Sequence, residues 1–265
     1  YSTQSLDQTD KESVLEVLGS GHLSRGPKIN QFETELGFMC KNNNVIAVNS
    51  ATSALQIAYQ INDIKSGSLV WTSPITFVAT ANAALNLGAQ IDFVDINPET
   101  LNICPTELEK KLKIAKAKNR IPDLVVLVHF GGNPCDMDKI YALSQKYGFN
   151  IVEDASHALG AIFSKEVIGN CKFSNGAIFS FHPVKMITTG EGGALLTKTE
   201  EAYQRARSLR SHGISEDRSN LEDKNMPEWF YEQVNQGYNF RLSDLQAALG
   251  LSQLKKLDSF VEIRN

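Results

Sequence analysis

SFHPVKMITTGEGG, residues 180–193, places Lys185 between an apolar strand and a glycine-rich turn. The strand is predicted over residues 176–180 (GAIFS), and a second short strand, residues 194–197, follows the turn. A lysine at the mouth of a buried sheet is partly desolvated, which lowers its pKa from about 10.4. The neutral amine can then attack an aldehyde and form a Schiff base. An isolated lysine beside a turn is more often a surface residue, so other segments of the chain are needed to choose between a surface lysine and a Schiff-base lysine.

Strand and helix patterns alternate on both sides of this stretch. Short apolar runs predict strands at residues 45–48, 69–72, 90–94, 124–129 and 149–153. Helical periodicity lies between and around them, at residues 11–18, 28–40, 51–59, 77–87, 106–115, 137–147, 200–210 and 243–257. This alternation predicts an α/β fold with a mostly parallel sheet and helices on both faces. Residues 215–227 are predicted to form a mobile surface loop.

Composition excludes several classes of protein. The 265 residues are 42% hydrophobic, which is ample for a large core, and the net charge of −4 offers no basic surface for nucleic acid. No apolar run approaches the length of a membrane span, and no signal peptide is visible. The cysteines are far apart and form no CxxC pair, which predicts a cytoplasmic protein with reduced thiols and no metal site: Cys40, Cys104, Cys135 and Cys171.

Small polar residues follow the first predicted strand, as NSATSAL at residues 49–55. Such residues let a helix N-terminus come close to a ligand, and the free N–H groups there suit a phosphate. An ordinary Ser/Thr helix cap is the better explanation when this motif is taken alone. The segment is not a Walker loop, since the chain has no GxxxxGK[ST] motif.

An acidic pair ends another predicted strand, in EDASH at residues 153–157. A carboxylate at this position, Asp154, can hold a cationic ring nitrogen in its protonated form. A helix-capping aspartate with a satisfied histidine nearby is an equal alternative. A metal site at Asp154 and His157 is less favoured, because no further ligand cluster lies close in sequence.

Two more residues at strand ends add to the pattern. Phe77 follows the strand at 69–72 and can lie flat over an aromatic cofactor, although a core phenylalanine is the commoner role. Ser180 ends its own strand and can donate to a phosphate. A phosphate cradle, a carboxylate for a ring nitrogen, a stacking aromatic and a Schiff-base lysine together indicate pyridoxal 5′-phosphate (PLP).

The chain resembles the sugar aminotransferases of the DegT/DnrJ/EryC1/StrS family from Ser5 to its end. The motifs that carry the resemblance stand in the family's order: Gly26-Pro27, Phe32-Glu33, NSATSAL, SPITFVATANAAL, EDASHALGA, SFHPVK with TTGEGG, LRSHGI (209–214) and GYNFRLSDLQAALGLSQLKKLD (237–258). The resemblance implies the PLP-dependent fold type I, similar to aspartate aminotransferase. It also implies a large PLP-binding domain over residues 1–240, with residues 1–30 as an N-terminal segment. Residues 241–265 would begin a connecting helix to a C-terminal small domain that is missing here.

The resemblance implies a role for each matching residue. Lys185 would be the Schiff-base lysine and Asp154 the partner of the pyridine nitrogen. His157 stands where the family has Gln or His near the 3′-oxygen of the ring. The remaining cofactor contacts would come from Ala51, Thr52 and Ser180 at the phosphate, Phe77 on the ring face and Asn239 from the neighbouring subunit of a homodimer. Ala51 replaces a glycine that is common elsewhere in the family.

The implied reaction is transfer of an amino group from L-glutamate to a nucleotide-linked keto-sugar. Within the family, the sequence motifs are most similar to those of the transaminase branch of pseudaminic acid biosynthesis. The acceptor of that branch is a UDP-linked 4-keto-6-deoxy-N-acetyl-hexosamine. His182 either faces the substrate or is a structural turn histidine. Alternatives are a C3 or dTDP/GDP-sugar aminotransferase, or a PLP-binding regulatory protein without turnover. A dinucleotide-binding oxidoreductase is disfavoured because no GxGxxG follows the first strand.

Overall fold

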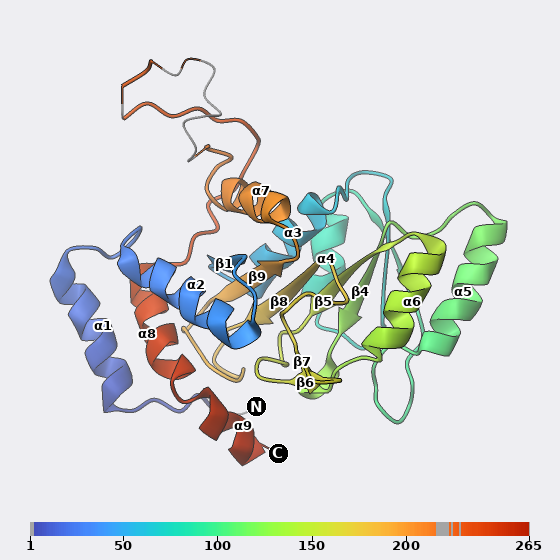
Figure 1. Cartoon of the computed structure of the whole chain (residues 1–265), viewed down its shortest axis with the longest axis horizontal. Coiled ribbons are helices and arrows are strands. Elements are labelled where there is room, and N and C mark those ends of the chain that lie inside the picture. The colour runs from blue at the N-terminus through green and yellow to red at the C-terminus, as the bar shows by residue number, and fades with distance from the viewer. Residues whose placement is uncertain (1–2, 216–222, 224, 228, 265) are drawn as a thin grey trace.

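A computed structural model describes residues 3–215, 223, 225–227 and 229–264 of the chain (Figure 1). Its helices are α1 (Gln8–Ser20), α2 (Pro27–Cys40), α3 (Ala51–Ile61), α4 (Ala79–Leu85), α5 (Pro105–Ala117), α6 (Met137–Tyr147), α7 (Glu200–Arg210), α8 (Asp244–Leu254) and α9 (Leu257–Arg264), with a short 3₁₀ turn η1 (Phe130–Gly132). Most of the predicted loop at 215–227 lies outside the described residues.

A seven-stranded sheet runs through the middle of the described part of the chain, in the order β1-β9-β8-β5-β4-β2-β3. Its strands are β1 (Val45–Val48), β2 (Leu69–Thr72), β3 (Gln90–Phe93), β4 (Leu124–Val128), β5 (Asn150–Asp154), β8 (Gly176–Ser180) and β9 (Gly193–Thr197). All strands run the same way except β9, which pairs antiparallel with both β8 and β1. The mostly parallel sheet predicted from the sequence is therefore confirmed, with one reversed strand.

Side chains alternate across the two faces of this sheet, as the period of two along a strand requires. On one face Val126 and Ile178 pack with residues of α3, α4 and α7. On the other face Phe179 packs with residues of α2 and α8, and Val125 packs with residues of α5 and α6. Figure 1 shows the helices on both sides of the strands. A sheet covered on both faces explains why its strands read as continuous apolar runs.

Several elements differ from the sequence-based expectation. Helix α4 begins at Ala79 instead of residue 77, and the helix expected over 243–257 ends at Leu254 before α9 begins at Leu257. A small hairpin, β6 (Ile162–Phe163) and β7 (Glu166–Val167), was not predicted. Its turn residues Ser164 and Lys165 both have positive φ, 49° and 70°, in a turn that usually carries Asn or Gly.

The parallel direction of β1, β4, β5 and β8 brings their carboxyl ends to one edge of the sheet. The segments that leave this edge carry the residues singled out in the sequence. A sheet of this kind binds its ligands outside those ends. Within the described residues, no helix has the length and apolarity that a membrane span requires.

Candidate active site

Lys185 lies in the turn between β8 and β9, and its backbone N–H donates to the carbonyl of His182 (2.9 Å). Its Nζ lies 2.6 Å from Nε2 of His157, which comes from the segment after β5. Burial lowers the pKa of Lys185, while the charge of Asp154 acts in the opposite direction. The geometry thus brings a partly desolvated amine to the end of the sheet, within electrostatic range of a carboxylate.

His157 shares this environment. Burial and the neighbouring Lys185 charge lower its pKa, and Asp154 again opposes the shift. Two bases 2.6 Å apart, both with lowered pKa values, hold one proton more easily than two, so the pair favours one N–H donor facing one free lone pair.

Asp154 is the last residue of β5 and is 5% exposed. Its Oδ2 accepts a hydrogen bond from the hydroxyl of Thr80 (2.8 Å). Its Oδ1 accepts from the hydroxyl of Ser156 (2.6 Å) and, at 3.3 Å, from the Ser156 N–H. The carboxylate is therefore held from two sides by hydroxyl donors, and neither Thr80 nor Ser156 was predicted from the sequence. Ser156 could have been found from the Asp-x-Ser turn spacing, whereas Thr80 depends on the tertiary fold.

The N-terminus of α3 meets β8 and β9 at the same edge. Val48, Gly193 and Ser180 lie side by side on β1, β9 and β8. A Cβ added at Gly193 would lie 2.5 Å from the backbone nitrogen of Ala51, so only glycine allows this approach. The hydroxyl of Ser50 caps the N–H of Ser53 (3.1 Å), and the first N–H groups of a helix have no partner within the helix. These features make a small cradle suited to an anion.

The other predicted residues are exposed at the surface. Phe77 precedes α4 and is 74% exposed, so its ring face is open. Thr52, His182 and Asn239 are also exposed, on α3, on the lysine turn and on the segment that runs beside the end of β1. The backbone of that last segment is fixed by Asn49 N–H donating to the carbonyl of Phe240 (2.9 Å).

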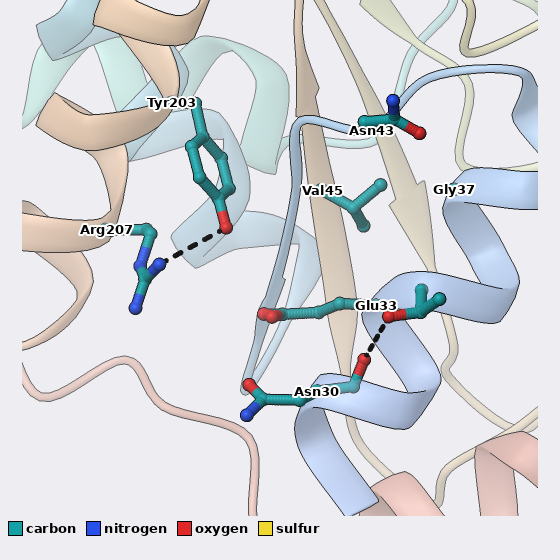
Figure 2. A pocket seen from close by; sticks show the side chains of 8 residues that line it. Asn30, Glu33, Gly37, Asn43, Val45, Tyr203 and Arg207 are labelled. Atoms are coloured by element: carbon teal, nitrogen blue, oxygen red, sulfur yellow. Dashed lines mark hydrogen bonds between the residues drawn. The ribbon is translucent and has the colours of Figure 1, made fainter.

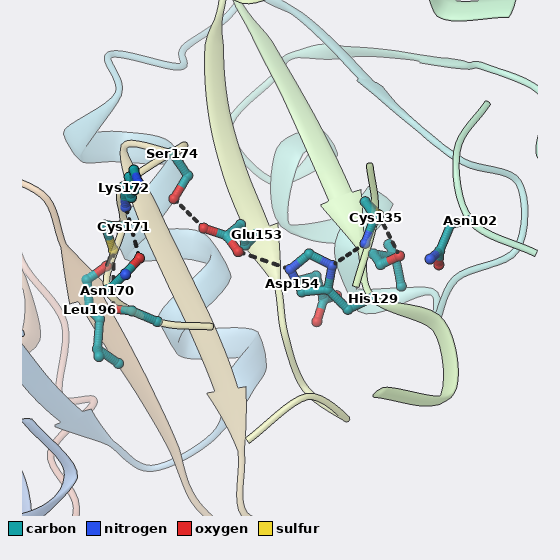
Figure 3. Close-up of polar contacts among 12 residues, drawn as sticks. Asn102, His129, Cys135, Glu153, Asp154, Asn170, Cys171, Lys172, Ser174 and Leu196 are labelled. Atoms are coloured by element: carbon teal, nitrogen blue, oxygen red, sulfur yellow. Dashed lines mark hydrogen bonds and ion pairs between the residues drawn. The ribbon is translucent and has the colours of Figure 1, made fainter. Parts of the chain in front are cut away.

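A buried polar network lies behind the carboxylate (Figure 3). Glu153 accepts from the Ser174 hydroxyl and lies 2.9 Å from Nε2 of His129, while the Cys135 N–H donates to Nδ1 of that ring (3.1 Å). Because Nδ1 accepts this N–H, it carries no proton, and the ring is the neutral Nε2–H tautomer that donates to Glu153. The sequence alone had not pointed to this network.

A separate pocket of about 390 Å³ lies at the outer edge of β1, between α2 and α7 (Figure 2). The carboxylate of Glu33 in this pocket already makes structural hydrogen bonds, because its Oε1 accepts from the N–H of Ala47 (2.8 Å) and from Arg210 (2.6 Å). None of the residues predicted to act in chemistry lines this pocket. The strand-end constellation is therefore the better candidate site.

The residues present fit PLP on structural grounds. The cradle at Gly193 excludes a side chain where a phosphate would need backbone N–H groups, and the Lys185 amine and the Asp154 carboxylate lie on segments leaving neighbouring strand ends. The comparison with known proteins agrees: residues 4–265 match the profile of the DegT/DnrJ/EryC1/StrS aminotransferase family. The chain belongs to this family.

Relatives of this aminotransferase family align with the whole chain. It is 43% identical to a UDP-4-amino-4,6-dideoxy-N-acetyl-β-L-altrosamine transaminase of Campylobacter jejuni, and 41% identical to the spore coat polysaccharide biosynthesis protein SpsC of Bacillus subtilis. Each alignment covers 100% of this chain and 66% of the relative. The chain thus spans just under two thirds of the length of these relatives.

Solved structures of the family share the fold. The PseC aminotransferase of Helicobacter pylori, involved in biosynthesis of pseudoaminic acid, superposes with a TM-score of 0.87 at 35% identity, over 98% of this chain and 66% of that one. A sugar aminotransferase of Streptococcus pneumoniae, solved in its PLP form, superposes with a TM-score of 0.83 at 25% identity, over 98% of this chain and 67% of that one. The prediction of the PLP-dependent fold type I is confirmed, as is that of the family, whose aminotransferases use PLP.

Proposed function

We propose that this chain is the cofactor-binding part of a PLP-dependent aminotransferase of nucleotide-sugar biosynthesis. Its donor is L-glutamate, and its acceptor is C4 of a UDP-linked 4-keto-6-deoxy-N-acetyl-hexosamine of the pseudaminic acid route. The observation that carries the proposal is the half-buried Lys185 amine, 2.6 Å from His157 and within the field of Asp154. The 43% identity to the Campylobacter jejuni transaminase supports the choice of acceptor.

Each residue of the site has a task that suits this reaction. When bound, PLP supplies an electron sink for the charge that develops on the amino acid α-carbon. Lys185 acts as the base that removes the α-proton and returns it, since its pKa is lowered by burial. Asp154 holds the ring nitrogen protonated, and His157 lies beside Lys185 to orient the ring oxygen and share its proton.

The remaining contacts complete the site. The backbone N–H groups of Ala51 and Thr52, with the hydroxyl of Ser180, hold the phosphate. Phe77 covers one ring face, and the exposed His182 faces the sugar substrate. Asn239 reaches the phosphate site of the neighbouring subunit, so that the active unit is a homodimer.

The organisation of the whole protein follows the same proposal. Residues 1–240, including an N-terminal segment over 1–30, form the PLP-binding domain, and residues 241–265 begin the connection to a small domain. The enzyme is cytoplasmic and binds neither nucleic acid nor membrane. The greater length of the relatives supports a further domain.

A second candidate is an aminotransferase for another nucleotide keto-sugar. The 41% identity to a spore coat polysaccharide protein favours it, because two relatives of nearly equal similarity carry different descriptions. The same residues would act on the amino donor in both cases. The two candidates differ only in which keto-sugar is accepted.

The first test is the half-reaction with the amino donor. We expect the chain to bind PLP with a change in visible absorbance, and L-glutamate to reverse that change while 2-oxoglutarate is released. Lys185→Ala is expected to lose the glutamate response by at least about 1000-fold in rate, since the base and the covalent attachment are both removed. UDP-linked and dTDP-linked 4-keto-sugars, added next, identify the acceptor.

Lys110→Ala is the matched control, because Lys110 lies exposed on α5 and pairs only with Glu107 (2.7 Å) among the described residues. It should behave as wild type. An equal response of Lys110→Ala and Lys185→Ala, or wild-type PLP binding without any effect of glutamate, would contradict a transaminase. A folded protein that binds no PLP would overturn the interpretation of these residues as a PLP site.

A further inference from the structure

Thr80 is the donor that connects α4 to the carboxylate of the site. Its side chain is fully buried, and its hydroxyl donates to Oδ2 of Asp154 at 2.8 Å. Its backbone carbonyl accepts from the hydroxyl of the buried Tyr59 (2.8 Å). Thr80 is therefore held by hydrogen bonds at both its side chain and its backbone.

The direction of the neighbouring hydrogen bond follows from this contact. An ionised carboxylate only accepts, so the single proton of the Thr80 hydroxyl is committed to Asp154. The hydroxyl of Thr76 lies 2.8 Å from that of Thr80, and must be the donor of the two. A directed relay thus runs from Thr76 through Thr80 to Asp154. Thr76 immediately precedes Phe77, the exposed aromatic residue of the site.

Hydroxyl groups are the main partners of this carboxylate. Among the described residues Asp154 forms no ion pair within 4 Å, and its side-chain oxygens accept from Thr80 and Ser156. Ser156 is two residues away and half-buried, so its contact is local. Within the described part of the chain, Thr80 supplies the only hydrogen bond to this side chain from another element, which makes it the group that orients the carboxylate relative to the rest of the site.

We propose that Thr80 is a positioning residue that aims the Asp154 carboxylate at the ring nitrogen, and that Thr76 couples this carboxylate to the segment carrying Phe77. The inference rests on the proposed function, since it concerns the same cofactor. Its consequence is that the contact of Asp154 with the ring nitrogen and the contact of Phe77 with the ring face depend on each other. Loss of the Thr80 hydroxyl therefore weakens both contacts.

The test compares three substitutions of buried threonines. Thr80→Val keeps the shape and removes the donor, while Thr80→Ser keeps the donor and removes a methyl group. Thr72→Val is the matched control: Thr72 is also fully buried, at the end of β2, but its hydroxyl donates to the carbonyl of Val126 (3.0 Å) and not to the site. Each variant is first compared with wild type by urea unfolding.

Two readouts then follow, one of which needs no cofactor. The first is the dissociation constant of PLP. The second is the ¹³C signal of the Asp154 carboxyl in cofactor-free protein, assigned by its absence in Asp154→Asn. A hydrogen bond to a charged group typically changes binding by about 10-fold or more.

We expect Thr80→Val to weaken PLP binding about 10-fold and to shift the ¹³C signal of the Asp154 carboxyl, because the carboxylate loses its hydrogen-bond donor from α4. Thr80→Ser should restore both readouts, and Thr72→Val should change neither. Equal effects of Thr80→Val and Thr72→Val, or an unchanged carboxyl signal in Thr80→Val, would overturn the inference. If wild type binds no PLP, the proposed function fails, while the carboxyl signal still decides whether the Thr80 hydroxyl holds the Asp154 carboxylate.

Discussion

The chemistry of Lys185 depends on where the chain places it. Burial alone lowers its pKa, and the charge of Asp154 limits how far. A lysine on the outer surface, such as Lys110, has the opposite shift because Glu107 raises its pKa. The two lysines therefore differ in reactivity although they are chemically identical, and the difference can be measured without any cofactor.

The pH dependence of amine labelling tests this contrast. The rate of reductive methylation by formaldehyde should rise with pH with a midpoint below 10.5 at Lys185 and above 10.5 at Lys110. Asp154→Asn should lower the Lys185 midpoint further, since it removes the charge that favours the ammonium form. Mass spectrometry of peptides reads each lysine separately. A common midpoint for the two lysines would contradict the assigned burial.

Sequence reasoning singled out Lys185 and Asp154 but not the hydroxyl donors that contact Asp154. Asp154 was predicted because it stands at the end of a strand, and Lys185 because it lies in the glycine-rich turn that follows another. Thr80 was not, because a threonine in a helix pattern carries no signal until α4 packs over the end of β5. The pairing of Glu153 with His129 was missed for the same reason, since it joins the ends of two strands.

At the scale of the elements, side chains from two helices hydrogen-bond the backbone of the edge strand β1. Among the described strands, β1 pairs with β9 on one side, and its other side has an isolated bridge from Val48 to Arg241, which leaves the backbone groups of Ala47 without a strand partner there. Glu33 of α2 accepts from the Ala47 N–H, and Arg210 of α7 donates to the Ala47 carbonyl (3.1 Å) while pairing with Glu33. Two helices are thereby attached to the edge strand through one largely buried ion pair.

Removal of the Glu33 carboxylate should be costly. Glu33→Ala leaves Arg210 without its counter-charge and Ala47 without an acceptor, so we expect unfolding to become easier by about 3 kcal/mol. Glu33→Gln keeps an acceptor and should lose less. Glu35→Ala, on the exposed side of the same helix, is the control and should stay within about 0.5 kcal/mol of wild type. Urea unfolding followed by circular dichroism measures all three, and equal values for Glu33→Ala and Glu35→Ala would refute the edge-capping role.

Strand positions were predictable and strand direction was not. The run at 45–48 is apolar throughout, and the structure gives β1 those bounds. The antiparallel direction of β9 could not be predicted from its sequence, because a buried strand is apolar whether it runs parallel or antiparallel to its neighbours. The β6–β7 hairpin was missed because Ser164 and Lys165 lack the turn chemistry by which such hairpins are found.

At the scale of the whole molecule, the N-terminal helix is attached through α8. Asp10 of α1 is 1% exposed, and its Oδ2 accepts from Gln253 (2.9 Å) and Lys256 (2.8 Å). Burial by itself raises the pKa of Asp10, but the hydrogen bonds, led by that from Lys256, lower it overall. In Figure 1 the two helices lie side by side at one end of the sheet.

This attachment should depend on pH. Because the folded-state pKa of Asp10 is below 3.8, its contribution to stability is present above about pH 4 and is lost as pH falls through the lowered value. Asp10→Ala should remove about 2 kcal/mol at neutral pH and speed hydrogen exchange in α1. Asp258→Ala, at an exposed position of α9, is the control. Unchanged exchange in α1 of Asp10→Ala would show that the other contacts between the helices, such as the Ser13 hydroxyl donating to the Ala248 carbonyl (2.8 Å), are sufficient to hold α1.

The reversed strand also has a consequence for the order in which the chain assembles. Strands β8 and β9 are neighbours in sequence, so the turn that carries the lysine can form early from local contacts. Strand β1 reaches the sheet only by pairing with β9, across most of the chain, and it brings the N-terminus of α3 with it. The anion cradle is then among the last features to be completed. A ligand held there cannot guide folding, and it would act by slowing the escape from the finished state.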